Sequence, residues 1–127
     1  MVPAPIRVLV VDDDIAVLRS LTAFLEDENF DVLSTNSAKE ALNILAIETI
    51  DLAVVDVRLR EMDGEELILR AHAGRPTTKY VVYTGSLNYQ APASLAIAGV
   101  TQANVVYKPA RSLSAMADDI RRIAGGT

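Results

Sequence analysis

Short apolar runs alternate with segments of helical periodicity along the chain, and this alternation constrains the fold more than any other feature. Four runs, at residues 6–11, 52–55, 80–83 and 105–107, are strongly apolar and rich in β-branched side chains. A fifth, weaker run covers residues 31–35. Runs this apolar favour strands that are covered on both faces, as in a parallel sheet.

Helices are predicted between the strands. Ser37 and Glu40 have the spacing of a capping box, in which the serine side chain accepts a backbone N–H and the glutamate reaches back to the cap. Asp63 precedes a glutamate with the same spacing, and Pro92 opens a short fourth helix that ends near Gly99. The apolar stripes of the helices are formed by Leu18, Leu21 and Leu25, by Leu42 and Leu45, and, after a cap at Ser112, by Leu113, Met116, Ile120 and Ile123.

Five strand–helix units predict an α/β fold, a (βα)5 doubly wound parallel sheet with right-handed crossovers and helices on both faces. The length of 127 residues suits one domain and is too short for two, so residues 1–127 are expected to form a single domain. Sheets of this kind carry their sites beyond the carboxyl ends of the strands.

Polar residues occur at those strand ends. Asp12 and two further aspartates follow the first strand, Asp56 ends the third, Thr84 ends the fourth, and Lys108, followed by Pro109, ends the fifth. Each residue alone has an ordinary explanation as a helix cap, a turn residue or a solvated charge. Because the fold would bring all four strand ends to one edge of the sheet, their joint occurrence predicts a functional site.

The chemistry of these residues fits phosphoryl transfer. Carboxylates that share a site repel each other by about 4 kcal/mol per pair at about 4 Å and an effective dielectric constant of about 20. A hard divalent cation such as Mg²⁺, held by Asp13 and Asp56, removes this repulsion and lets Asp56 attack a phosphoryl group. Lys108 would neutralise charge on the phosphoryl oxygens, and the Thr84 hydroxyl would donate to another of them. The Lys108–Pro109 peptide can adopt the cis form, which would aim the lysine.

The composition argues against several other functions. The net charge of −5 argues against direct nucleic-acid binding, which needs a basic face. Without cysteine the chain has no disulfide framework, thiolate nucleophile or cysteine-ligated metal, and its single histidine cannot form a histidine-rich metal site. No apolar stretch approaches the roughly 20 residues that span a bilayer. Residues 1–5 have no basic or apolar signal region, so a cytoplasmic protein without membrane contact is expected.

The sequence resembles the receiver domains of two-component response regulators, including the single-domain chemotaxis type. The similarity runs from Ile6 to about Ile123 and rests on the segments VLVVDDD, LAVVDVRL, EMDG, YTG and YKP, which as a set are highly specific. It implies a flavodoxin-like three-layer sandwich with strand order 2-1-3-4-5. It also implies a signalling domain rather than an enzyme, with catalysis confined to its own aspartyl phosphorylation and dephosphorylation.

By this resemblance, Asp56 is the phosphoacceptor and Mg²⁺ is the cofactor. Asp12 and Asp13 form the acidic pair that holds the metal, one of them through water. Asp56 and the backbone carbonyl of Arg58 complete the protein ligands of the cation.

The resemblance also makes Lys108 the lysine that contacts the phosphoryl group and Thr84 the switch hydroxyl. Phosphorylation would then change the surface formed by the fourth predicted helix, the fifth strand and the last helix. The implied donor is a sensor histidine kinase or a histidine phosphotransfer protein. The implied recipient of the signal is a downstream effector domain or protein, or a second copy in a phosphorylation-dependent dimer.

The chain departs from the family pattern around the switch. Val105 stands at the switch position three residues before the lysine, where Phe or Tyr is usual, and Arg60 stands where proline is common. Ala110 replaces the phenylalanine that often follows Lys-Pro. Tyr107 is expected to point to the other face of the strand and so not to replace the missing ring. We therefore interpret the relay as a backbone shift of the loop after the switch threonine.

Three other functions are considered. A phosphatase of the haloacid-dehalogenase type would use Asp12 as nucleophile. Its DxDx(T/V) pattern would fall on Asp12, Asp14 and Ala16, and alanine at the last position breaks the pattern. A flavodoxin-like cofactor binder needs a hydroxyl- and glycine-rich phosphate loop where this chain has three aspartates. The strongest alternative is a phosphorylation-independent pseudo-receiver that acts as an interaction scaffold, which Arg60 and Val105 favour.

Overall fold

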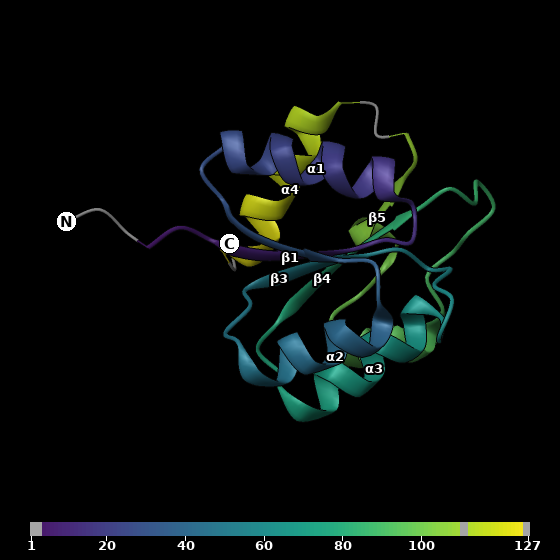
Figure 1. Cartoon of the computed structure of the whole chain (residues 1–127). Coiled ribbons are helices and arrows are strands. Elements are labelled where there is room, and N and C mark those ends of the chain that lie inside the picture. Colours follow the sequence, from purple (N-terminus) through teal and green to yellow (C-terminus); the bar gives the residue numbers. More distant parts are fainter. Residues whose placement is uncertain (1–3, 110–111, 126–127) are drawn as a thin grey trace.

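The computed structural model describes residues 4–109 and 112–125 and contains one parallel sheet with strand order β2-β1-β3-β4-β5 (Figure 1). This confirms the predicted fold and strand order. The strands predicted at residues 31–35, 52–55 and 105–107 have the predicted bounds. In chain order the elements are β1 (Arg7–Val11), α1 (Ile15–Asp27), β2 (Asp31–Thr35), α2 (Ala38–Ile47), β3 (Leu52–Val55), α3 (Gly64–Gly74), β4 (Lys79–Thr84), the 3₁₀ helices η1 (Ala93–Ala98) and η2 (Gln102–Asn104), β5 (Val105–Tyr107) and α4 (Leu113–Ala124).

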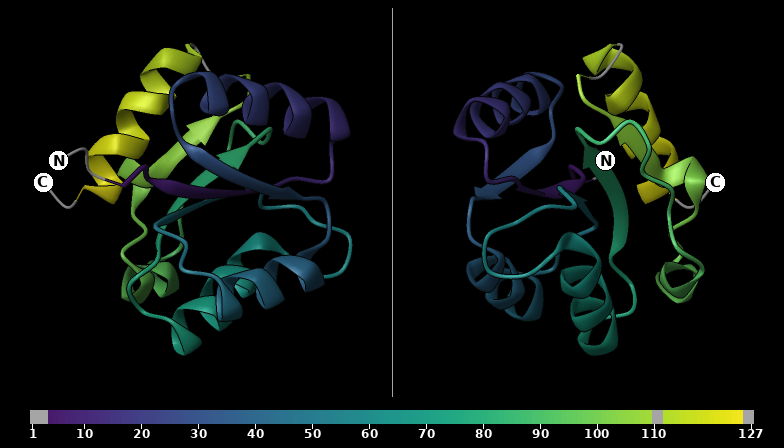
Figure 2. Two further views of the ribbon diagram at one scale, coloured as in Figure 1. Left: turned by 60° about the vertical axis from the view of Figure 1, so that its left-hand side comes forward. Right: turned by 90° about the vertical axis from the view of Figure 1, so that its right-hand side faces the viewer.

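The sheet is the middle of three layers. Helices α1 and α4 cover one face, and α2, α3 and η1 cover the other (Figures 1 and 2). The inner strands contribute side chains to both cores in alternation: in β1, Val8 and Val10 pack with α1 and α4, whereas Leu9 and Val11 pack with α2 and α3. Because both faces of the strand are covered, its sequence has no polar face.

Only half of the predicted capping box forms at the start of α2. The Ser37 hydroxyl accepts a hydrogen bond from the Glu40 N–H at 3.1 Å, as predicted. The Glu40 side chain, however, does not reach back to the cap, and the Ser37 N–H donates to Thr35 Oγ1 at 3.1 Å. The Ser37 hydroxyl also donates to Glu61 Oε1 at 2.9 Å, and the Lys39 N–H donates to the same oxygen at 3.3 Å. The positive end of the helix is therefore satisfied by a carboxylate from the β3–α3 loop.

Single side chains cap the other α-helices. Asp14, Asp63 and Ser112 each accept a hydrogen bond from a backbone N–H in the first turn of α1, α3 and α4 respectively. Such caps satisfy backbone donors that have no partner inside the helix. None of the helices in the described ranges is both long and apolar enough to span a lipid bilayer.

The predicted fourth helix is a 3₁₀ helix rather than an α-helix. Pro92 lies at its N-cap instead of in its first turn, and no side chain caps it. Leu95 and Ala98, three residues apart, are its buried positions, which matches the threefold period of a 3₁₀ helix. Gly99 ends it with a φ of 79°, a conformation that glycine adopts readily.

We expect Tyr80→Phe to leave stability at pH 7 unchanged or to raise the free energy of unfolding by up to about 1 kcal/mol. Tyr80 in β4 is 1% exposed, and its hydroxyl has no hydrogen-bond partner among the described residues. Burial raises the pKa of Tyr80 from 10.0 to about 12. In wild type, ionisation of the unfolded phenol therefore removes stability as the pH rises from 10 towards 12, by about 1 kcal/mol at pH 11.

The phenylalanine variant has no phenol to ionise and so does not lose this stability. The difference in free energy of unfolding between the variant and wild type should therefore grow between pH 10 and pH 11. Urea unfolding at a series of pH values would measure both effects. A Tyr80→Phe protein that is clearly less stable than wild type at pH 7 would show that the hydroxyl does have a stabilising partner.

Candidate functional site

The parallel register of the sheet brings the predicted site residues to one edge. Asp12, Asp56 and Lys108 directly follow β1, β3 and β5, and Thr84 is the last residue of β4. Backbone hydrogen bonds fix these positions: the Asp56 N–H donates to the Val11 carbonyl at 3.0 Å, and the Lys108 N–H donates to the Thr84 carbonyl at 2.7 Å. The structure therefore gathers residues separated by almost a hundred positions in the chain.

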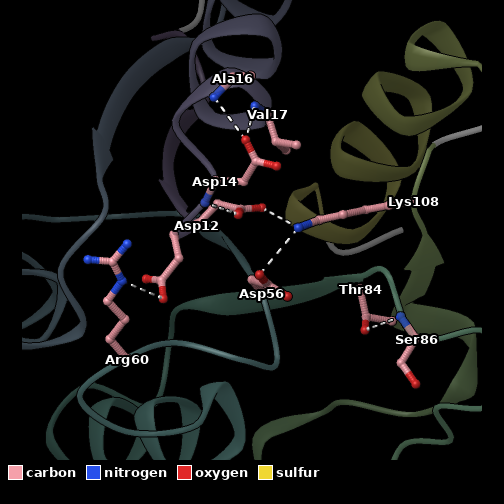
Figure 3. A network of polar contacts seen from close by, with 10 residues as sticks. Asp12, Asp14, Ala16, Val17, Asp56, Arg60, Thr84, Ser86 and Lys108 are labelled. Carbon is pink, nitrogen blue, oxygen red and sulfur yellow. Dashed lines mark hydrogen bonds and ion pairs between the residues drawn. The ribbon is translucent and has the colours of Figure 1, made fainter.

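Lys108 joins two carboxylates at the centre of this edge (Figure 3). Its ammonium nitrogen lies 2.6 Å from Asp12 Oδ2 and 3.2 Å from Asp56 Oδ2. Asp12 is 2% exposed, and its other oxygen accepts the Asp14 N–H at 2.9 Å. The ammonium also lies 5.5 Å from the centre of the Tyr83 ring, within the range of a cation–π contact.

Burial and charge shape the ionisation of the central pair. Burial, followed by the negative charge of Asp12, raises the pKa of the Asp56 carboxyl above its ordinary value, and Lys108 opposes the rise. Burial lowers the pKa of the Lys108 ammonium, but its hydrogen bonds and charge contacts with Asp12 and Asp56 outweigh this and raise it overall. Lys108 thus offsets only part of the cost that burial and Asp12 place on ionised Asp56, and a further positive charge would favour the ionised form.

Asp13 lies beside the central group and contacts a different cation. Its Oδ2 is 3.8 Å from Arg60 Nε, and the Arg60 side chain is largely exposed. The other carboxylate oxygen, Oδ1, is buried without a hydrogen-bond partner in the described part of the chain. The structure thus places Asp12 and Asp56 together on Lys108 and leaves Asp13 with Arg60.

The acidic residues fit a hard divalent cation in their donor chemistry. Among the described residues, no three acidic, histidine or cysteine side chains are already gathered into a metal-binding group. Asp13 nevertheless has a buried oxygen with no partner among the described residues, and the pKa of Asp56 is raised first by burial and then by the negative charge of Asp12. Carboxylate oxygens with unmet charge are the ligands that Mg²⁺ prefers.

The loop from Asp56 to α3 is closed on itself and packs tightly against Asp56. Arg58 and Asp63 form an antiparallel bridge, and the Gly64 N–H donates to the Val57 carbonyl at 2.6 Å. A Cβ at Gly64 would collide with the carbonyl oxygen of Asp56 and lie 3.0 Å from its carbonyl carbon. Only glycine therefore allows α3 to begin where it does.

Thr84 lies at the same edge but is engaged locally. Its hydroxyl accepts the Ser86 N–H at 3.1 Å (Figure 3). In the part of the chain that the structure describes, no side-chain hydrogen bond joins Thr84 to Asp56 or Lys108. The Lys108–Pro109 peptide bond is cis.

The expected orientation of Tyr107 is wrong. Val105 packs against the core that α2 and α3 cover, and the Tyr107 hydroxyl donates to the carbonyl of Tyr89, which packs against that same core. Residues 105 and 107 share a face because side chains of a strand alternate with a period of two. Ala110, the departure after Lys-Pro, lies outside the described residues.

A depression adjoins Lys108 between α1 and the start of α4. Its volume is about 610 Å³, and its lining includes Asp14, Val17, Leu21, Tyr83, Pro109 and Leu113. The lining is mainly apolar, with Asp14 and Lys108 as its charged residues, so an apolar surface adjoins the Lys108 side of the central group.

Three contacts of the site were not predicted from the sequence: Arg60 with Asp13, Tyr83 with Lys108, and Glu61 with Ser37. The first two could have been suspected, because Arg60 carries charge into the loop after Asp56 and Tyr83 directly precedes Thr84. The third joins two loops that are not neighbours in sequence, and no local pattern indicates it.

Comparison with known proteins gives a consistent result. Residues 8–118 match the response regulator receiver domain family. The alginate biosynthesis transcriptional regulatory protein AlgB of Pseudomonas aeruginosa is 30% identical over 94% of this chain, and the transcriptional regulatory protein GlrR of Escherichia coli is 34% identical over 63% of it. The alignments cover only 30% of AlgB and 18% of GlrR, so this chain spans less than a third of these relatives.

Solved structures show the same likeness. A CheY-like response regulator receiver domain protein from Methanospirillum hungatei has a TM-score of 0.82 and 29% identity, with 96% of this chain and 95% of that chain covered. The non-phosphorylated HemR receiver domain from Leptospira biflexa, at 24% identity, has a TM-score of 0.81 and covers 96% of each chain, which shows the shared fold.

We expect Gly64→Ala to lower the free energy of unfolding by about 1–3 kcal/mol and to move the backbone of Asp56. The added methyl group would overlap the Asp56 carbonyl, which belongs to the backbone and cannot rotate away. Chemical denaturation would give the stability, and the amide resonances of residues 55–58 would report the displacement.

Gly74→Ala is the matched control, because an added Cβ there has nothing within 4 Å. Gly74 ends α3, and alanine favours a helix, so this variant should be as stable as wild type or slightly more so. Equal effects of the two substitutions would contradict the close approach at Gly64.

Proposed function

This chain belongs to the response regulator receiver domain family of two-component systems, and from this we propose that Asp56 accepts a phosphoryl group from a phosphohistidine. The observation that carries the proposal is the position of Lys108 between Asp12 and Asp56 at the carboxyl edge of the sheet. Receiver domains are signalling domains. The specific proposal for this chain is that its own residues catalyse both the phosphorylation of Asp56 and its hydrolysis.

Each side chain has a distinct part in the transfer. An Asp56 oxygen forms a bond to phosphorus while the phosphorus–nitrogen bond of the donor breaks, and its electron pair leaves with the imidazole, which takes up a proton from water. Lys108 already lies 3.2 Å from Asp56 Oδ2, close enough to balance charge that builds on the phosphoryl oxygens. The Thr84 hydroxyl, which the Ser86 turn holds nearby, donates to another of these oxygens.

Mg²⁺ is the proposed cofactor, held by Asp12, Asp13, Asp56 and the Arg58 carbonyl. When bound, the ion supplies positive charge that offsets the repulsion between the carboxylates and the phosphoryl oxygens. The unpartnered Asp13 oxygen supports this assignment. Arg60 contacts the same carboxylate and would have to give way as the cation binds.

The partners follow from the family. We propose that the donor is a sensor histidine kinase or a histidine phosphotransfer protein, which would approach over the depression beside Lys108. The recipient is an effector domain or protein, or a second copy of the chain, contacting η1, β5 and α4. Residues 1–127 then act as one receiver domain in the cytoplasm, with no direct contact to nucleic acid or membrane.

The comparisons do not favour the alternatives. The family match supports a phosphoaccepting receiver over a pseudo-receiver scaffold, and the contact of Lys108 with Asp12 and Asp56 is consistent with it. Asp12, the nucleophile of the phosphatase alternative, has a side chain that is 2% exposed, against 13% for Asp56. It is therefore less accessible to a substrate than Asp56.

We expect intact-mass measurement to show one added phosphoryl group after incubation with Mg²⁺ and acetyl phosphate, and no addition in Asp56→Asn. The amide oxygen of asparagine cannot form the acyl phosphate. Addition should also disappear when EDTA removes the metal. An unmodified wild-type protein that also fails to bind beryllofluoride would overturn the proposal in favour of the scaffold.

Asp13→Asn should weaken Mg²⁺ binding by about tenfold or more, because it removes a charged oxygen ligand. Asp14→Asn is the matched control: it makes the same change one residue away, and asparagine can still cap α1 as Asp14 does. Isothermal titration calorimetry with MgCl₂ would compare them. Similar affinities for the two variants would mean that Asp13 contributes only general negative charge.

A further inference from the structure

The loop of residues 85–92, between β4 and η1, is tied down by side chains from three other elements. The Tyr107 hydroxyl of β5 donates to the Tyr89 carbonyl at 2.6 Å and accepts from Gln102 Nε2 at 2.6 Å. Gln102 Oε1 in η2 accepts the Ala91 N–H at 3.0 Å. The Tyr89 hydroxyl donates to Glu65 Oε2 of α3 at 2.7 Å. We call these four hydrogen bonds the tyrosine latch.

One end of the latch leads to the Thr84 hydroxyl. The Tyr89 N–H donates to the Ser86 carbonyl at 3.1 Å, and the Ser86 N–H donates to Thr84 Oγ1 at 3.1 Å. Tyr89 is thus separated from that hydroxyl by two hydrogen bonds of one turn. The Thr84 hydroxyl is therefore bonded to the same turn to which Tyr89 belongs.

The other end of the latch leads to Asp56 by a separate route. Glu65 directly follows Gly64, whose α-carbon has no room for a side chain because the Asp56 carbonyl packs against it. Movement of the backbone at Asp56 therefore reaches the carboxylate that holds the Tyr89 hydroxyl. The latch therefore joins one route from Thr84 and a second route from Asp56.

Tyr107, and not residue 105, supplies the aromatic contact with this loop. Val105 is half-buried against the core and has no polar group with which to hold a loop. Tyr107 lies two residues further along the same face of β5 and holds the loop through its hydroxyl. The tyrosine at position 107 thus makes the contact with the loop that Val105 cannot make.

The groups of the latch are only half-buried or exposed. Hydrogen bonds of this kind add modestly to stability, so the latch can open without unfolding the domain. Burial, followed by the hydrogen bond and charge of Glu65, raises the pKa of Tyr89 above its ordinary range, which keeps the hydroxyl a proton donor.

We propose that Tyr89 and Tyr107 are positioning residues for the Thr84 hydroxyl, and that the tyrosine latch holds the loop until phosphorylation of Asp56 releases it. The release step rests on the proposed function. A phosphoryl group on Asp56 attracts the Thr84 hydroxyl, which pulls on the Ser86 turn and strains the Tyr89–Tyr107 contact. The latch stabilises the unphosphorylated arrangement of the loop. Part of the free energy of interaction with the phosphoryl group is therefore needed to break the latch when the domain switches.

The test compares three tyrosine-to-phenylalanine variants of the full chain. Tyr107→Phe and Tyr89→Phe each remove a latch hydroxyl, whereas Tyr80→Phe removes a hydroxyl with no partner among the described residues and serves as the matched control. Phosphorylation by acetyl phosphate with Mg²⁺ is followed by intact mass. The two latch variants should be phosphorylated about two- to tenfold faster than wild type, the range expected for one lost hydrogen bond. Tyr80→Phe should match wild type.

Amide resonances provide a readout that needs no phosphodonor. In the latch variants, the resonances of residues 85–91 should shift from their wild-type positions toward those of beryllofluoride-bound wild type. Glu65→Gln keeps an oxygen acceptor for the Tyr89 hydroxyl and should stay close to wild type, whereas Glu65→Ala should behave like Tyr89→Phe. Thermal unfolding confirms that each variant is folded before rates are compared.

Unchanged or slower phosphorylation of both latch variants, alongside a normally phosphorylated wild type, would overturn the proposal and leave the proposed function intact. Unchanged resonances of residues 85–91 in both variants would be enough to show that Tyr89 and Tyr107 do not hold this loop. A wild-type protein that is not phosphorylated would overturn the proposed function and the release step together.

Discussion

The contact of the Lys108 ammonium with Asp12 and Asp56 is the interaction on which the rest of the site depends. These groups are drawn from the ends of β5, β1 and β3, and they are mostly buried, so their mutual attraction is poorly screened by water. The lysine balances only part of the negative charge that the aspartates bring to this edge. The site thus has a positive group in place for an incoming phosphoryl group and unmet negative charge suited to a metal ion.

Close packing around the β3–α3 loop turns this charge arrangement into a fixed geometry. Gly64 lets α3 begin against the backbone of Asp56, and Glu61 ties the same loop to the start of α2. The loop after β4 is restrained differently, by hydrogen bonds among half-buried side chains. One loop at the site is therefore held by packing and the other by polar contacts that are weaker and easier to break, which suits a part that must respond to phosphorylation.

Much of the fold could be predicted from local patterns. The uniformly apolar runs indicated strands buried on both faces, and the bounds of β2, β3 and β5 agree with the prediction. The fourth helix was less predictable: a proline and a glycine mark its limits, but with no polar cap and so few residues it forms a 3₁₀ helix. The capping box at Ser37 was half right, because the Ser37 N–H donates to Thr35 Oγ1 and not to Glu40. Glu61, which accepts from the Ser37 hydroxyl and the Lys39 N–H, comes from another loop, and sequence spacing cannot indicate a partner that arrives through the tertiary fold.

The sequence by itself determined the α/β class, the edge of the sheet that carries the site, and the residue types gathered there. These follow from strand ends and connection rules, which depend on local order along the chain. Only the tertiary structure decided which groups pair. It placed Lys108 on Asp12 and Asp56, paired Asp13 with Arg60, and brought the Tyr107 hydroxyl to the Tyr89 carbonyl. Such pairings depend on distances of a few ångströms between segments far apart in the sequence, and these distances are set by how the strands and helices pack.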